Sequence, residues 1–345
     1  MKIGLGINYA GGFKEVVAEV ADLEKAGLDV VFVPEAYSFD AISALGYLAA
    51  ATERVELASG VLQLYTRTPT LTAMTAAGLD YVSDGRYILG LGASGPQVIE
   101  GFHGLPYDNP IGRTREVVEI CRQVWRRERL AYQGKHYTIP LPEGQGTGLG
   151  KSLKLINHPV RERIPVLLAA LGPKNVELAA EIAEGWQPIF YMPEKAKDVW
   201  GDALDAGYAK RDASLPPMDI YAGPALAIGD NVEGLREFIK PHIALYIGGM
   251  GAKGKNFYHN VATKYGYGAE ADRIQELYLA GDKDGAAKVV PDELVRDISL
   301  IGSREFVKER VAAFRESGVT VLNVVPMGAT TADRVKLIEE LRELV

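Results

Sequence analysis

The sequence has a single cysteine, no long apolar run and no excess of positive charge. Cys121 is the only cysteine among 345 residues, so an intramolecular disulfide and a thiolate cluster for zinc or iron–sulfur are both excluded. No run of about 18 apolar residues is present, and residues 1–10 lack the apolar core of a signal peptide. We therefore expect a cytoplasmic protein without a membrane span.

The charge balance is acidic. The chain has 45 acidic and 38 basic residues, for a formal net charge of −7. This balance argues against nucleic acid as a general partner. Hydrophobic residues make up 47% of the chain, the composition of a globular protein with a large core. The 38 glycines indicate many tight turns and close backbone approaches.

Short apolar runs alternate with segments of helical period along the chain. The strand candidates are residues 2–7, 29–34, 54–61, 87–92, 164–170, 186–191, 220–228 and 320–326. A helical pattern follows each of them, and such crossovers require parallel strands. Eight units in one series predict a (β/α)8 TIM barrel, formed as a single domain over residues 1–345. An open, doubly wound sheet is the alternative.

Two segments interrupt the series. Residues 128–163, after the fourth helix, are rich in glycine and proline, and residues 246–300 lie between the seventh and eighth strands. We expect both to be insertions, and long insertions are often functional. Because barrels of this class carry their sites at the carboxyl ends of the strands, the residues that follow each strand are the site candidates.

The segment from Gly90 to Gly95 matches G-x-G-x-x-G. It follows the fourth strand rather than the first and does not open a clean helix, so a dinucleotide-binding fold is disfavoured. Glycines here let a ligand approach the backbone, or they only relieve crowding at a barrel turn. The small residues at the end of the third strand, Ser59 and Gly60, permit either a bulge or a close ligand approach.

A phosphate site is predicted where the fifth strand meets its helix. Residues 170–174 read Ala-Leu-Gly-Pro-Lys. Pro173 suits a first helical turn, whose unpaired N–H groups attract anions, and Lys174 adds positive charge. A plain helix start is the alternative.

Three ionisable residues are candidates for proton transfer. Glu35 ends the second strand and is either a helix cap or a site carboxylate. His103 and His259 fall in loops expected at the same end of the barrel, although a solvated or packed histidine is the simpler interpretation. The five histidines show no metal-ligand spacing, so we predict no metal site.

Several longer motifs together resemble a known family. They are DYVSDGRYILGLGASGP followed by GFHG, then IPVLLAALGPKNVELAAEIAEGW, and LYIGGMGAKGKNFYHNVATKYGY. This combination resembles the luciferase-like monooxygenase superfamily over nearly the whole chain. The last two segments are similar to its coenzyme F420-dependent oxidoreductase branch, near methylene-tetrahydromethanopterin reductase.

The resemblance implies a (β/α)8 barrel that holds a deazaflavin at the carboxyl ends of its strands. Residues 59–61 would carry a non-prolyl cis peptide behind the ring, at one of two bonds. Glu35 falls where relatives carry an aspartate beside the ring. The implied cofactor-binding residues are Asn8, Ser59, Gly60, Val61, Ala93, Ser94, Gly95, Ala170, Gly172, Pro173, Lys174, Gly185 and Trp186.

Two departures from the family restrict the activity. The family's sugar-phosphate dehydrogenases place a catalytic histidine where this chain has Ala36, and an acid where it has Gly95. The resemblance therefore implies an F420-dependent oxidoreductase, working as a reductase on a small organic substrate and forming a homodimer. An FMN-dependent monooxygenase and a non-catalytic binding protein are the alternatives.

Overall fold

The computed structural model describes residues 1–7, 12–251 and 253–345. Eight parallel strands pair in a closed ring, because β1 pairs with both β2 and β13. The ring consists of β1 (Lys2–Gly6), β2 (Val30–Val33), β3 (Glu56–Ser59), β5 (Tyr87–Gly92), β8 (Val166–Ala169), β9 (Gly185–Gln187), β10 (Asp219–Ala222) and β13 (Val321–Pro326). The predicted TIM barrel is confirmed, and the open sheet is excluded.

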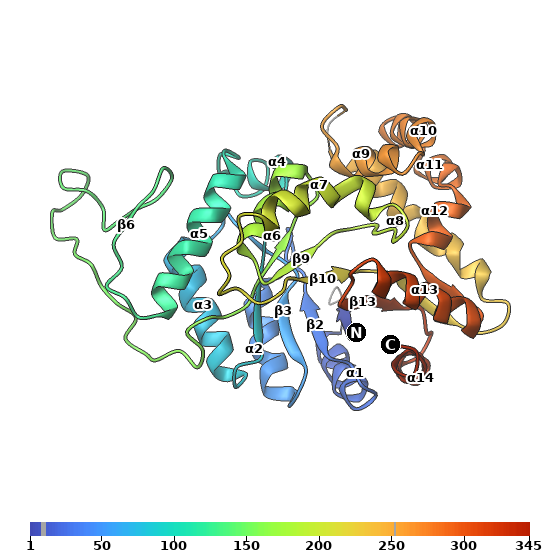
Figure 1. Ribbon diagram of the computed structural model, residues 1–345, viewed down its shortest axis with the longest axis horizontal. Helices are drawn as coiled ribbons and strands as arrows, with labels where there is room; N and C mark the ends of the chain where they lie inside the picture. The colour runs from blue at the N-terminus through green and yellow to red at the C-terminus, as the bar shows by residue number, and fades with distance from the viewer. Residues whose placement is uncertain (8–11, 252) are drawn as a thin grey trace.

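Helices cover the outside of the barrel (Figure 1). They include α1 (Phe13–Lys25), α2 (Ala41–Ala51), α3 (Pro69–Val82), α5 (Pro110–Trp125), α6 (Pro173–Ile182), α7 (Ala196–Tyr208), α13 (Arg304–Glu316) and α14 (Thr331–Arg342). Their starts follow simple capping rules. Thr68 accepts the Leu71 N–H at the start of α3, and proline occupies the first turn of α3, α5 and α6.

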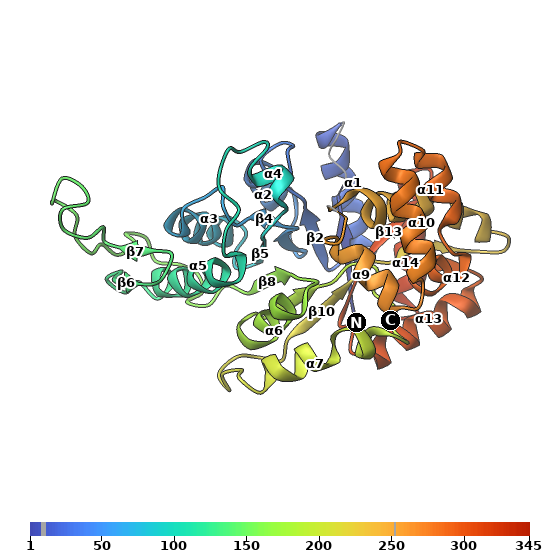
Figure 2. The same cartoon turned by 90° about the horizontal axis from the view of Figure 1, so that it is seen from above.

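The segment after α5 projects from the barrel (Figure 2). It contains a small antiparallel ribbon of β6 (Tyr132–Gln133) and β7 (Thr138–Ile139). The buried carboxylate of Glu116 accepts N–H groups of the ribbon turn, from Lys135 at 2.8 Å and Tyr137 at 2.9 Å. At the other end Arg161 pairs with the fully buried Asp80. Both ends are therefore anchored to the helical layer.

The chain between the seventh and eighth barrel strands is mostly helical. It contains β11 (Ala225–Ile228), η1 (Glu233–Ile239), α8 (Lys240–Ala244), η2 (Leu245–Gly249), α9 (Phe257–Lys264), α10 (Gly268–Leu279), α11 (Lys283–Val289), α12 (Asp292–Asp297) and β12 (Leu300–Gly302). The sequence analysis missed β12, which pairs with β11 outside the closed ring. No helix in the described ranges is long and apolar enough to cross a membrane.

The barrel interior is packed in layers of four side chains from alternate strands, as the stagger of this barrel class requires. Following the strand register from the amino end, the layers are Val30, Ile88, Gly185 and Val321; then Gly4, Ala58, Leu167 and Tyr221; then Phe32, Gly90, Gln187 and Asn323; and last Gly6, Gly60, Ala169 and Gly223. The apolar residues of the first three layers form one buried cluster. The fourth layer has no side chain larger than a methyl group, so the side chains of this layer do not close the barrel at its carboxyl end.

Candidate active site

The third strand is broken by a bulge at this carboxyl end. Ala58 pairs with Ile88, but the next pair is Leu62 with Leu91, so β3 and β4 (Leu62–Gln63) carry one residue more than β5. The bond between Gly60 and Val61 is a cis peptide. The sequence pattern left a bulge and a close ligand approach open, and the structure shows the bulge.

The Ser59 side chain connects β3 to β5 at the bulge, where the pairing between the two strands is interrupted. Its Oγ accepts the Gly90 N–H at 2.8 Å and donates to the Gly90 carbonyl at 2.8 Å, and it lies 3.0 Å from the Tyr87 hydroxyl. Ser59 is fully buried. The serine hydroxyl therefore joins two strands, and the backbone of Gly60 and Val61 is the part of this segment that borders the mouth.

The predicted glycine-strand and phosphate residues come together at the neighbouring strand ends. Ala93, which follows β5, and Ala170, which follows β8, line one small cleft with Thr114 of α5 and Asn175 of α6, on the helix side of the strands. Ser94 has a φ of 59°. Gly172 precedes α6, and a Cβ on it would contact Phe257 of α9, so the helical insertion covers this turn.

Lys174, on the first turn of α6, is exposed. Its Nζ lies 3.0 Å from Glu177 Oε2, and Lys210 binds the other oxygen of the same carboxylate. Hydrogen bonds from Lys210 and Lys174 lower the pKa of Glu177 to about 2. The two lysines leave one net positive charge beside the helix N-terminus, which favours an anionic ligand there.

The structure revises one cofactor prediction. Gly185 and Gln187 face the barrel interior, so Trp186 between them faces outward. Trp186 is fully buried against Trp200 and Tyr191, and its Nε1–H donates to the Ala170 carbonyl at 2.9 Å. The indole therefore positions the turn after β8 instead of lining the mouth, and Gly185 lies in the lowest interior layer.

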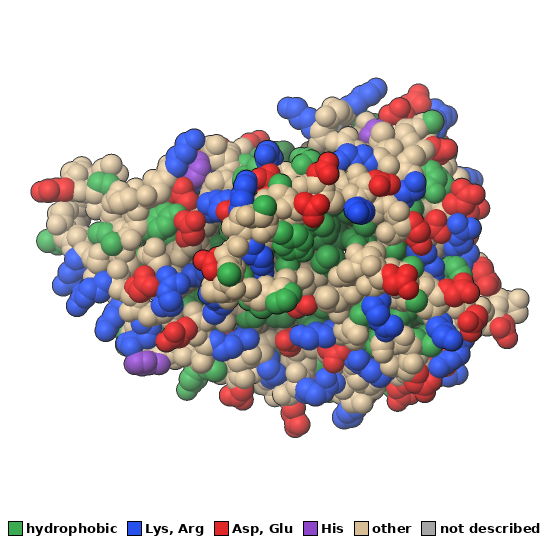
Figure 3. Space-filling view, in the orientation of Figure 1, with side chains coloured by type: hydrophobic (Ala, Val, Ile, Leu, Met, Phe, Trp, Pro, Cys, Tyr) green, Lys and Arg blue, Asp and Glu red, His purple; other side chains and the backbone are tan. Residues whose placement is uncertain are grey.

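Trp186 instead borders a separate hollow of about 410 Å³ on the outer surface, between α7 and the end of α13. Figure 3 shows apolar side chains at the bottom of this hollow.

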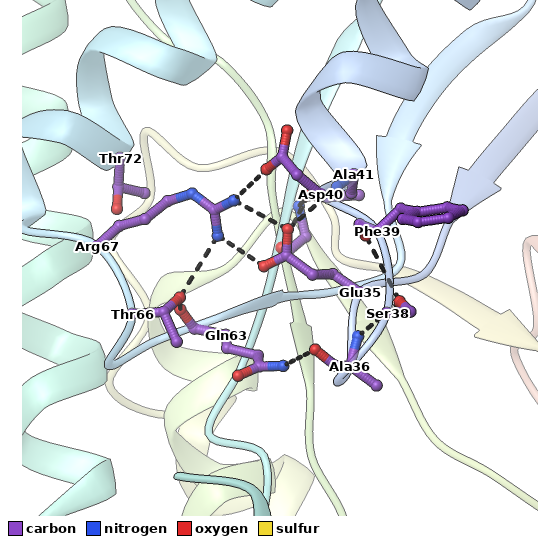
Figure 4. Close-up of polar contacts among 12 residues, drawn as sticks. Glu35, Ala36, Ser38, Phe39, Asp40, Ala41, Gln63, Thr66, Arg67 and Thr72 are labelled. Carbon is purple, nitrogen blue, oxygen red and sulfur yellow. Dashed lines mark hydrogen bonds and ion pairs between the residues drawn. The ribbon is translucent and has the colours of Figure 1, made fainter. Parts of the chain in front are cut away.

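Glu35 is held in a partly buried ion-pair cluster (Figure 4). Arg67 donates from Nη1 to Glu35 Oε1 at 2.6 Å and from Nη2 to Glu35 Oε2 at 2.8 Å, and its Nη2 also reaches Asp40 at 2.7 Å. The Ala41 N–H donates to Glu35 at 3.1 Å. The hydrogen bond to Glu35 raises the pKa of Arg67, so the guanidinium stays charged.

A second contact fixes the same loop. The Gln63 Nε2 donates to the Ala36 carbonyl at 2.7 Å. The loop between β2 and α2 is thus tied to the segment after β4 by one ion pair and one amide. It carries the exposed aromatic residues Tyr37 and Phe39, and the Tyr37 ring lies 6.2 Å from that of Phe102. The sequence analysis missed Arg67 and Gln63, since neither lies in a recognised motif.

Replacing Arg67 with methionine is expected to lower the free energy of unfolding by about 2–4 kcal/mol, because Glu35 would remain as a largely buried carboxylate without a counter-charge. The Arg67 and Glu35 side chains are only 14% and 9% exposed. Arg273→Met is the matched control, since its pair with Glu276 is exposed and is expected to contribute less than about 1 kcal/mol. Urea unfolding measures both variants. Equal losses would contradict the assigned role of Arg67.

The two candidate histidines occupy different surroundings. His103 Nε2 is buried and has no hydrogen-bond partner in the described part of the chain. His259 lies on α9 and its Nε2 is 2.9 Å from Asp272 of α10, within the helical insertion. Asn8 lies outside the described residues.

An aromatic cluster lies beyond the end of β9. Phe190 contacts His242, Tyr246 and Tyr258 edge to face. Burial lowers the pKa of His242 and raises the pKa of Tyr258 to about 12. Both groups are therefore neutral near pH 7, so this cluster adds no charge to the carboxyl end of the barrel.

The fold is a closed (β/α)8 barrel whose candidate site residues gather at the carboxyl ends of its strands. Residues 1–321 match the profile of the luciferase-like monooxygenase family. The chain belongs to this family, which confirms the resemblance inferred from its motifs.

The individual relatives cover all or nearly all of the chain. One relative is a Mycobacterium tuberculosis protein named as a coenzyme F420-dependent oxidoreductase. It is 43% identical to this chain, over 100% of this chain and 99% of that protein. The 5,10-methylenetetrahydromethanopterin reductase of Archaeoglobus fulgidus is 27% identical, over 98% and 97% of the two chains. The coenzyme F420-dependent tetrahydromethanopterin reductase structure from Methanopyrus kandleri has the same fold, with a TM-score of 0.83, 22% identity and coverage of 100% and 99%.

Proposed function

We propose that this protein is a coenzyme F420-dependent oxidoreductase that transfers a hydride between the deazaflavin and a small organic substrate, working as a reductase. The observation that carries the proposal is the fourth barrel layer, where Gly6, Gly60, Ala169 and Gly223 leave the mouth open above two amide side chains. A flat ring can enter such a mouth without displacing side chains. The 43% identical relative supports the choice of F420, and the reductases above support the direction.

The described residues fit this cofactor. The backbone of Gly60 and Val61 would border the ring, with Ala93, Ser94 and Gly95 at the next strand end. Ala170, Gly172, Pro173 and Lys174 would bind the phosphate side, where the first turn of α6 offers N–H groups beside a lysine. When bound, the deazaflavin supplies the carbon that carries the hydride.

The protein's own part is to orient the reactants, exclude water and supply a proton. Reduction of a C=O bond places the hydride on carbon and needs a proton at oxygen. Both Glu35 oxygens bind Arg67, and His259 binds Asp272, whereas the buried His103 Nε2 has no partner among the described residues. Of the three candidates we propose His103 as the proton donor, and Glu35 as a positioning residue.

The direct test is an equilibrium titration of the purified protein with F420 and with FMN. The cofactor's own absorbance should be followed, because Trp186 lies outside the mouth. We expect micromolar binding of F420 and at least tenfold weaker binding of FMN. Tight binding of FMN with none of F420 would place the protein among the monooxygenases, and a folded protein that binds neither would overturn the proposal.

We also propose that the protein is a homodimer. Several large apolar side chains are exposed on α2 and α3, including Tyr47, Leu71, Met74, Tyr81 and Val82. Two neighbouring helices with such a surface suit an isologous contact, in which the same face serves both copies.

A further inference from the structure

Two amide side chains in the third barrel layer have unsatisfied oxygen atoms. Gln187 Oε1 and Asn323 Oδ1 are both buried, and neither has a hydrogen-bond partner in the parts of the chain that the structure describes. They lie on β9 and β13, at the same height in the barrel. A buried carbonyl oxygen without a donor costs folding free energy. A ligand that donates hydrogen bonds would recover this loss.

The space above these amides is open. The two layers on the amino side hold large side chains such as Val30 and Tyr221, which belong to the buried cluster. The layer on the carboxyl side holds only glycine and alanine, and a Cβ on Gly6 would meet no described atom within 4 Å. Gln187 and Asn323 thus form the floor of the mouth, where a ligand that enters deepest would end.

This floor carries no charge. Neither the third nor the fourth layer contains an ionisable side chain. Glu35, two residues beyond β2, is already paired with Arg67. A carboxylate or phosphate at this depth would lose its hydration without gaining a counter-charge, which is unfavourable. The ligand group that reaches the floor should therefore be neutral.

We propose that Gln187 and Asn323 form a paired-amide floor that recognises an N–H group flanked by carbonyls, as in an imide or a lactam. The two amide oxygens accept from the ligand N–H, and the amide NH2 groups donate to its carbonyls. The inference rests on the proposed function, since the group is either the pyrimidinedione edge of the cofactor or part of the substrate. It makes these two residues determinants of ligand specificity.

The test compares Gln187→Met and Asn323→Leu with wild type. Gln275→Met is the matched control, because the Gln275 Nε2 is also buried without a partner but lies on α10 in the helical insertion. Thermal unfolding is measured without ligand, with F420, and with millimolar succinimide or its charged counterpart succinate, in the presence and absence of F420.

Without ligand, both floor variants are expected to unfold at the wild-type temperature or above it, because each removes an unsatisfied oxygen. If the floor binds the cofactor edge, the Kd of F420 rises about tenfold in each variant. If it binds the substrate, F420 binding is unchanged and stabilisation by succinimide is lost. The control should match wild type in every ligand titration.

Two results would overturn the proposal. One is that both variants bind F420 and succinimide as wild type does. The other is that they unfold at clearly lower temperature without ligand, which would assign the amides a structural role. If wild type binds no F420, the proposed function fails. The role of the amides is then decided separately, by whether succinimide stabilises the cofactor-free protein more than succinate does.

Discussion

Gly6→Leu is expected to weaken F420 binding at least about a hundredfold while leaving the fold intact. Gly6 lies in the fourth barrel layer at the end of β1, and a Cβ there would meet no described atom within 4 Å. The leucine side chain would therefore enter the mouth without pushing against the core. Overlap between a ligand and a fixed side chain costs several kcal/mol, and each 1.4 kcal/mol is a tenfold loss in affinity.

Gly234→Leu is the matched control for this change. Gly234 lies on η1, and a Cβ there also has no neighbour within 4 Å. Both variants should unfold within a few degrees of wild type, and only Gly6→Leu should lose cofactor binding in the absorbance titration. Wild-type affinity in Gly6→Leu would show that the ligand lies elsewhere.

Gly90→Ala is expected to have the largest effect on stability. A Cβ on Gly90 would overlap the carbonyl oxygen of Ser59, at the point where the Ser59 hydroxyl bonds both backbone groups of Gly90. Neither backbone segment can move without breaking the hydrogen bonds between Ser59 and Gly90 that connect β3 and β5. We expect a loss of about 4 kcal/mol or more in the free energy of unfolding, or failure to fold.

The control for this prediction is Gly46→Ala on α2, where a Cβ has no neighbour within 4 Å. Alanine in an open helical position should raise stability by about 0.5–1 kcal/mol. Urea unfolding of the two variants gives the comparison. A Gly90→Ala protein as stable as wild type would mean that Ser59 and Gly90 do not hold the two strands together.

The barrel could be predicted because the same pattern, an apolar strand followed by a helix, repeats along the chain. Continuously apolar runs such as residues 30–33 and 87–92 are typical of strands buried on both faces, and each is followed by a segment of helical period. β12 was not predicted, because this strand has only residues 300–302 and pairs only outside the ring. The break in the third strand was also invisible, since residues 54–61 read as one uninterrupted strand.

The site could be predicted only where a local pattern marks it. The helix start at Pro173 and the small residues at the end of β3 are such patterns. Trp186 was assigned to the mouth although strand alternation turns it outward, and Gln187 beside it was passed over. Asn323 carried a usable signal, a polar residue at an inward position of an apolar strand, but its unsatisfied oxygen appears only in three dimensions.

The most direct test of the central claim is a crystal structure of the protein with F420. The account predicts the deazaflavin ring above the layer of Gly6, Gly60, Ala169 and Gly223, with its phosphate side near Gly172 and Lys174. A ring bound anywhere else, for example in the hollow between α7 and α13 that Trp186 borders, would contradict it.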